Sequence, residues 1–221
     1  AAQAVSINGP AARELHQYQC AILYIPERGT PHIMFSHAGL AVGHFGVNLG
    51  AVSAMEIIDP GAAAGSANSL ALIRSLMYDA LSLRDGIEMV KADLPGYATT
   101  VVLGDGRYEL RSARLRGDGL GGLEERYDLA GDFATSTRGI IYASIPLLES
   151  AVQTQIDGYL PSVTVAELQA LAASSPSAEV GNNLLNIVVD GFTMELLVST
   201  AIGTNDAGIP DNKLDFQALL P

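Results

Sequence analysis

Cys20 is the first side chain to consider for covalent chemistry, because the chain has one cysteine and a thiolate is a strong nucleophile. It begins the apolar run Cys20-Ala-Ile-Leu-Tyr-Ile25, and a buried free cysteine mostly behaves as a small hydrophobic residue. A catalytic thiolate needs a basic neighbour, and His16 is four residues away in a predicted loop. The pattern therefore favours a structural Cys20, with a nucleophilic Cys20 as the alternative.

Two polar groups could bind a carbonyl or carboxylate. Ser136-Thr137-Arg138 opens a predicted helix, and an arginine among hydroxyls can hold a substrate carboxylate or orient the surroundings of a nucleophile. The alternative is a surface arginine near a helix start. Asn48 could donate a hydrogen bond to a carbonyl oxygen, but it stands among glycines, where a turn-forming role explains it equally well.

Metal and cofactor sites are not indicated. His32 and His37 lie an odd number of residues apart on one predicted strand, so we expect them to point to opposite faces. The glycines at 39, 43 and 46 do not have dinucleotide-binding spacing, and the Gly-x-Ser-x-Gly motif of serine hydrolases is absent. We expect no metal ion and no cofactor.

Composition narrows the class of protein. The 221 residues are 48% hydrophobic and 16% charged, which predicts a folded chain with a large core. A net charge of −12 argues against nucleic acid or an anionic membrane as partner, and no uninterrupted apolar run is long enough for a membrane span. The alternating run from Arg107 to Arg116 is predicted to be the solvated face of a strand. The cellular compartment, cytoplasmic or exported, stays open.

Hydrophobic periodicity and turn residues place the elements that must position these groups. Glycines at 39, 43, 46 and 50 predict a tight corner between two strands, at 30–37 and 47–55, where backbones approach closely. The predicted helices cover 68–81, 82–90, a segment after Ser136, and 164–171, of which 82–90 and 164–171 start with capping boxes. The other predicted strands cover 2–7, 18–25, 97–103, 107–115, 123–129, 184–189 and 194–200. We interpret residues 1–221 as one domain.

The order of these motifs resembles the isopenicillin N acyltransferase-like family, the penicillin acyltransferase relatives among N-terminal-nucleophile hydrolases. The resemblance rests on Ala38-Gly39 followed by Gly46-Val-Asn-Leu-Gly50, on the helix pair at 68–90, and on Ser136-Thr137-Arg138. It also includes Asn183-Leu-Leu-Asn-Ile-Val-Val-Asp190 with the hairpin strand that follows. The resemblance implies an α+β chain folded as a four-layer αββα sandwich. It implies acyl transfer or hydrolysis at a linear, non-peptide amide or thioester bond.

The chain departs from this family at the nucleophile. In the family an amino-terminal cysteine, exposed by self-cleavage, attacks the carbonyl while its own α-amine acts as base. Here the first residue is Ala1, Asn8 stands where the family has the Asn of an Asn-x-Asp element, and Pro10 occupies the Asp position. The nucleophile could precede Ala1, Ala1 could replace it after a shortened first hairpin, or the protein could have lost it.

The sequence therefore supports two functions. The first is an acyltransferase or amidohydrolase for a small acyl amide or thioester, with Arg138, Thr137, Asn48 and Cys20 as candidate catalytic residues and Ser136 and Asn8 as candidate substrate-binding residues. The second is an inactive family member that binds an acyl ligand or acts as an assembly module. The resemblance also leaves room for a homo-oligomer or for association with a cleaved amino-terminal segment.

Overall fold

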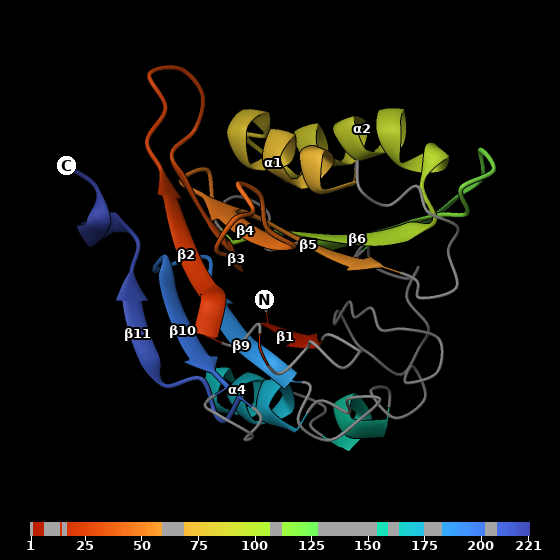
Figure 1. Cartoon of the computed structure of the whole chain (residues 1–221). Coiled ribbons are helices and arrows are strands. Elements are labelled where there is room, and N and C mark those ends of the chain that lie inside the picture. The colour runs from red at the N-terminus through yellow and green to blue at the C-terminus, as the bar shows by residue number, and fades with distance from the viewer. Residues whose placement is uncertain are drawn as a thin grey trace.

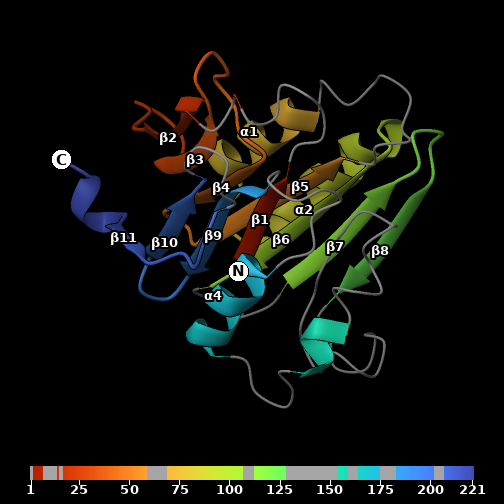
Figure 2. The same cartoon turned by 60° about the horizontal axis from the view of Figure 1, so that its bottom comes forward.

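Two antiparallel sheets stacked face to face form the middle of the molecule (Figure 1). The computed structural model describes residues 2–6, 14, 17–58, 69–106, 112–127, 154–158, 164–174, 183–201 and 207–221. Helices cover the outer face of each sheet, which gives four layers in the order αββα (Figures 1 and 2). The fold predicted from the sequence is confirmed.

The larger sheet is a meander in which each strand pairs with its neighbour in sequence, as expected when short turns join antiparallel strands. In the described residues it has seven strands: β2 (Gln19–Tyr24), β3 (His32–His37), β4 (Phe45–Asn48), β5 (Val52–Ile58), β6 (Thr99–Asp105), β7 (Ser112–Gly117) and β8 (Leu123–Tyr127).

The smaller sheet joins the two ends of the chain. Its described strands are β1 (Ala2–Ser6), β9 (Asn183–Asp190), β10 (Glu195–Thr200) and β11 (Asn212–Asp215), in the order β1-β9-β10-β11. The β9–β10 hairpin was predicted from its Asp190-Gly191 turn. The strand β11 was not, because its four residues, Asn-Lys-Leu-Asp, carry no β-branched or alternating apolar signal.

Three described α-helices form the outer layers. Helices α1 (Ser69–Asp79) and α2 (Leu83–Asp93) pack on the larger sheet, and α4 (Val165–Ala173) packs on β9 and β1. The short helical segments are η3 (Leu94–Gly96), η5 (Gln217–Leu219) and residues 154–158. The capping box predicted for α4 is present, since the side chain of Thr164 and that of Glu167 each accept a backbone N–H of the other residue. None of the described helices is long and apolar enough to cross a membrane.

Alternation along the strands of the larger sheet divides its side chains between two cores. One core lies between this sheet and helices α1 and α2, and includes Met34, Ala54, Leu76, Met77, Leu103 and Leu115. The other lies between the two sheets, and includes Ile33, Phe35, Phe45, Val47, Ile187, Leu196 and Phe216. We call the face of the larger sheet that carries Phe35 and Phe45 its inter-sheet face.

The predicted glycine corner at 39–50 is wrong in one respect. Residues 47–55 form two strands, β4 and β5, with a turn at 49–51 between them. The turn was missed because Ala51, which has a positive φ of 63°, is a residue that seldom adopts the left-handed region. Gly46 therefore lies in the middle of β4, where it pairs with Met34 and Ala54.

The side chain of Asn48 closes this turn and ties it to helix α1. Its Nδ2 donates hydrogen bonds to the carbonyl oxygens of Met77 (3.2 Å) and Ala80 (2.7 Å), and its Oδ1 accepts one from the amide of Val52 (3.1 Å). Asn48 is fully buried. Orphan carbonyls at the carboxyl end of α1 are thus satisfied by the β4–β5 turn.

Replacing Gly46 by valine should destabilise the protein. A Cβ atom at Gly46 would lie 2.8 Å from the Cγ of Met77 and 3.2 Å from the carbonyl oxygen of Ile33. We expect a loss of about 1–3 kcal/mol or more, as for an overpacked core, and a lower Tm in a thermal melt. Gly208→Val is the matched control, because a Cβ atom at Gly208 meets open space. An unchanged Tm in Gly46→Val would contradict this close packing.

Asn48→Ala should cost about 2–5 kcal/mol of unfolding free energy, since it leaves several buried backbone groups without their partner. Asn48→Asp separates the two roles, because it retains the acceptor for Val52 but removes the donor to Met77 and Ala80. Denaturant unfolding checks both variants against Asn212→Ala, which removes an exposed asparagine that donates to the carbonyl of Val198. Equal losses in Asn48→Ala and Asn212→Ala would show that the buried bonds contribute little.

Candidate functional site

The strand β1 is at the edge of the smaller sheet, next to β9, and faces β5 and β6 of the larger sheet (Figures 1 and 2). Ala2 pairs with Val188 of β9, and β1 runs antiparallel to β9 from there to Ser6. The start of β1 is therefore level with the last residues of β9. This is also the end of the sandwich where the β9–β10 turn and the β4–β5 turn lie.

We call this end of the molecule the turn end, defined by residues 49–51, 105–106 and 190–194. The amide of Gly106 donates to the carbonyl oxygen of Ala51 (3.1 Å), and a Cβ atom on Gly191 would lie only 2.6 Å from the Cα atom of Gly106. The described residues have two non-glycine positions with positive φ, Ala51 and Met194, and both lie here. Conformations of this kind cost energy and are found preferentially at functional sites.

Asp190 is an acidic residue of the turn end, and its pairing with Glu195 puts its side chain on the outer face of the smaller sheet. Its Oδ1 accepts hydrogen bonds from the amides of Phe192 (2.9 Å) and Thr193 (3.4 Å). Burial raises the pKa of Asp190, but the hydrogen bonds from Phe192 and Thr193 bring the pKa below its ordinary value. The carboxylate is therefore ionised at neutral pH.

The inter-sheet face changes from apolar to polar along the larger sheet. Cross-strand pairing puts Phe35, Phe45, Met55, Val102 and Arg114 in one row on this face. Ser53 and Thr100, on the neighbouring rows, are 7% exposed, as is Arg114. The polar part of the face belongs to β5, β6 and β7, and β1 faces the first two of these strands (Figure 2).

The burial of Arg114 corrects the solvated strand face predicted for the run from Arg107 to Arg116. The alternating pattern of this run correctly predicted a strand, β7. The side chains of Arg114 and Arg116, however, lie on the inter-sheet face, where Arg114 is buried and Arg116 is half-buried. A buried arginine brings a fixed positive charge and a planar set of donors into the interior. Sequence alternation identifies such a face but not what covers it.

The predicted site residues do not come together in the described part of the chain. Cys20 pairs with Ser36, on the helix side of the larger sheet, so the sheet separates it from the amino end of β1. The amide of Asn48 is engaged in the turn, which supports its turn-forming role. Asn8, Ser136, Thr137 and Arg138 lie outside the described residues, as does His16. The catalytic and binding roles of all six candidates stay predictions.

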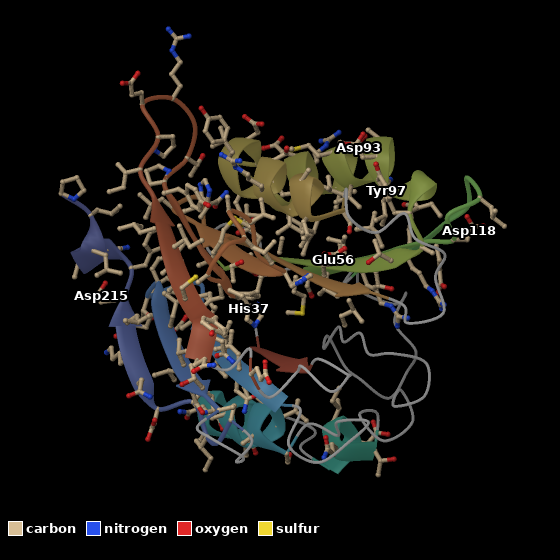
Figure 3. The ribbon with its side chains drawn as sticks, in the orientation of Figure 1. His37, Glu56, Asp93, Tyr97, Asp118 and Asp215 are labelled. Carbon is tan, nitrogen blue, oxygen red and sulfur yellow. The ribbon has the colours of Figure 1, made fainter. Side chains whose placement is uncertain are left out.

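A second polar cluster lies on the helix side of the same sheet. The Nδ1 of His44 is 3.1 Å from the Oε2 of Glu56, whose side chain is fully buried and also accepts from the hydroxyl of Thr99 (3.3 Å). A carboxylate at this distance orients the imidazole ring. Figure 3 shows Glu56 in the larger sheet and His37 in the space between the sheets.

The histidines do not form a metal site within the described chain. His32 stacks on Tyr24 with ring centroids 4.8 Å apart on the helix side, whereas His37 points to the inter-sheet side, as the sequence predicted. Burial lowers the pKa of both rings, and the charge of His44 lowers that of His37 further. The described residues contain no group of three or more His, Cys, Asp or Glu side chains placed to hold a metal ion.

Comparison with known proteins gives similarity in structure but not in sequence. No protein-family model matches the chain, and no curated protein matches it by sequence. An N-acylethanolamine-hydrolyzing acid amidase ortholog from Caenorhabditis elegans superposes with a TM-score of 0.68 at 6% identity, over 86% of this chain and 86% of that one.

Two bacterial enzymes have the same arrangement of layers. A variant of the conjugated bile acid hydrolase from Clostridium perfringens superposes with a TM-score of 0.58 at 9% identity, over 91% of this chain and 85% of that one. Penicillin V acylase from Agrobacterium tumefaciens superposes with a TM-score of 0.51 at 11% identity, over 90% of this chain and 78% of that one. The chain therefore has the αββα fold of the N-terminal-nucleophile hydrolases.

Proposed function

We propose that the protein is an acyltransferase or amidohydrolase that acts on a linear, non-peptide amide or thioester bond with an amino-terminal nucleophile. The observation that carries the proposal is the position of β1. This strand is at the edge of the smaller sheet, its amino end is at the turn end, and it faces the strands that begin the polar part of the inter-sheet face. The three structural neighbours are named as an amidase, an acylase and a hydrolase of a conjugate, which fits this class of reaction.

In the proposed reaction a thiol on the first residue of the mature chain attacks the substrate carbonyl. The α-amine of the same residue takes the thiol proton and later gives it to the leaving amine or thiol. The acyl group stays on sulfur as a thioester until water or another acceptor removes it. A cysteine ahead of Ala2 would supply this thiol at the level of Val188 to Asp190.

An arginine could hold the acyl ligand in this reaction. Arg138 is the candidate that the family resemblance supplies, together with Ser136 and Thr137. Arg114 is a second candidate, because it is buried on the inter-sheet face in a chain whose net charge is −12. A cation in a site that partly excludes water attracts an anionic or carbonyl-bearing ligand.

The competing proposal is an inactive family member that binds an acyl ligand. It is favoured by Pro10, which stands at the position of the family's Asp. The two proposals differ in what a nucleophile added at the amino terminus would do.

The chain beginning at Ala1 should show no turnover and no burst with a panel of acyl amides and acyl thioesters, because it has an α-amine but no nucleophile there. Ala1→Cys with a free amino terminus should gain one acyl group per chain from an acyl amide, as read by mass spectrometry; an acyl thioester does not serve here, because any amino-terminal cysteine reacts with it without a catalytic site. The matched control carries the same cysteine behind an added glycine, which removes the free amine next to the thiol. Acylation of Ala1→Cys but not of the form with the added glycine supports the enzyme, because the reaction then needs both the thiol and the adjacent free amine. If neither form is acylated and both still bind the acyl ligand, the inactive family member is supported.

Cys20 has to be tested in the same assay. Turnover by the chain that begins at Ala1, lost in Cys20→Ser, would identify Cys20 as the nucleophile and contradict the amino-terminal mechanism. We expect Cys20→Ser to leave the acylation of Ala1→Cys unchanged, because Cys20 faces the helices and not the space between the sheets.

A further inference from the structure

His32 is a buried histidine near the turn end that the proposed reaction does not use. It is 1% exposed and lies opposite Asn48 in the pairing of β3 with β4. Its Nδ1 is 2.8 Å from the carbonyl oxygen of Thr30, and because a carbonyl oxygen can only accept, Nδ1 carries the proton of the neutral ring. Nε2 is then an acceptor, and it has no hydrogen-bond partner among the described residues.

Two tyrosines and an arginine surround this ring. His32 stacks on Tyr24 with ring centroids 4.8 Å apart, and it meets Tyr78 of α1 in a T-shaped contact at 6.5 Å. The guanidinium group of Arg74, also on α1, is 5.7 Å from the centroid of the Tyr24 ring. The tyrosine that could stabilise an imidazolium ion is therefore already in contact with a cation, which would repel a second positive charge.

The ring lies where the hairpin of β2 and β3 is fastened to the rest of the larger sheet and its helices. The amide of Thr30 donates to the carbonyl oxygen of Tyr78 (2.9 Å), and the amide of Leu49 donates to that of Pro31 (2.9 Å). These two bonds join the hairpin to the end of α1 and to the β4–β5 turn. Opening of the hairpin at His32 would therefore loosen one side of the turn end.

The charged group that acts on His32 in the described part of the chain is Arg74. Other charged residues on the elements that pack against the ring are exposed, and water screens their charges: Glu27, Arg28 and Asp79. The remaining titratable neighbours, Tyr24 and Tyr78, are phenols, which supply no negative charge near neutral pH. A charge on His32 would thus be opposed by Arg74 and not offset by these neighbours.

We propose that His32 is an acid-sensitive switch, which fastens the β2–β3 hairpin to the end of α1 when its ring is neutral and releases the hairpin when its ring is protonated. The inference does not depend on the proposed reaction. A proton taken up from water forms an N–H bond at Nε2, where the described residues offer no acceptor. Burying such a charge without a partner is costly, and opening of the hairpin removes the cost because water then reaches the ring.

The direction of the pH dependence follows from the closed and open states. Burial lowers the pKa of His32, the hydrogen bond to Thr30 opposes this effect, and the charge of Arg74 lowers the pKa further. In the open state the pKa of the ring returns to its ordinary value of about 6.5. The open state therefore binds more protons. The closed hairpin has its full stability above about pH 6.5 and loses stability as the pH falls below this value.

Hydrogen exchange of the Thr30 amide reports on this opening, because the amide donates to Tyr78 of α1. In the wild type we expect the opening constant, corrected for the intrinsic exchange rate, to rise at least about threefold between pH 7 and pH 5. In His32→Phe, which keeps an aromatic ring but cannot be protonated, the opening constant should not change with pH. The amide of Phe216, which donates to Met194 (3.2 Å), reports on unfolding elsewhere and should not follow the Thr30 amide.

Three further variants serve as controls. His32→Asn replaces His32→Phe if that variant does not fold, since its side-chain amide is uncharged and can donate to Thr30. Arg74→Gln should reduce the rise in the opening constant because the neighbouring cation is gone, whereas Arg84→Gln removes an exposed arginine from α2 and should not change the rise. His37→Phe should also leave the rise unchanged, because burial lowers the pKa of His37 too but its side chain is on the inter-sheet side.

Four results would overturn the inference. The first is an opening constant of the Thr30 amide that is the same at pH 7 and pH 5 in the wild type. The second is a rise that persists in both His32→Phe and His32→Asn. The third is a rise that disappears in His37→Phe and not in His32→Phe, which would assign the switch to the other histidine. The fourth is an equal rise at Phe216, which would mean that acid unfolds the whole protein and not the hairpin.

Discussion

The contact between the backbones at Gly106 and Gly191 is the constraint on which the rest of the turn end depends. It brings the residue that follows β6 against the turn after β9, so the two sheets meet at main-chain distance at this point. Any Cβ atom at either position would separate them. Because β1 pairs with β9, this contact also fixes where the amino end of β1 lies relative to β5 and β6.

The inter-sheet face has an apolar part and a polar part, and the two parts contribute differently to the packing of the sheets. Over β3 and β4 the face carries phenylalanine and aliphatic residues, which pack against β9 and β10 and hold the sheets together. Over β5 to β7 it carries hydroxyls and Arg114, which cannot contribute in that way and are costly to bury unless they are hydrogen-bonded. Polar groups buried in this part of the interior stabilise the contact between the sheets less than apolar side chains would. The apolar part has to hold both sheets.

Much of the fold could be predicted from the sequence, since periodicity and turn residues report on local structure. The helices at 69–79, 83–93 and 165–173, the β9–β10 hairpin and the order of layers follow from such signals. The break between β4 and β5 could not be predicted, because it depends on Ala51 in a left-handed conformation and on an asparagine that reaches the distant helix α1. The site was harder still. The position of β1 opposite β5 and β6 arises from its pairing with β9, which joins residues almost the whole chain apart and leaves no local signal in the sequence.

The path from Asn48 to Gly191 has a consequence for how the sequence can change. Asn48 binds the end of α1 and the amide of Val52, Ala51 in the same turn accepts from Gly106, and Gly106 touches Gly191. Four segments from all parts of the chain are thus joined by groups that have specific partners and little free space. A substitution at any of these positions can be accepted only when its partners change with it. These positions should therefore evolve as a set, more slowly and in a more correlated way than the apolar core around them, where residues of similar volume can replace one another singly.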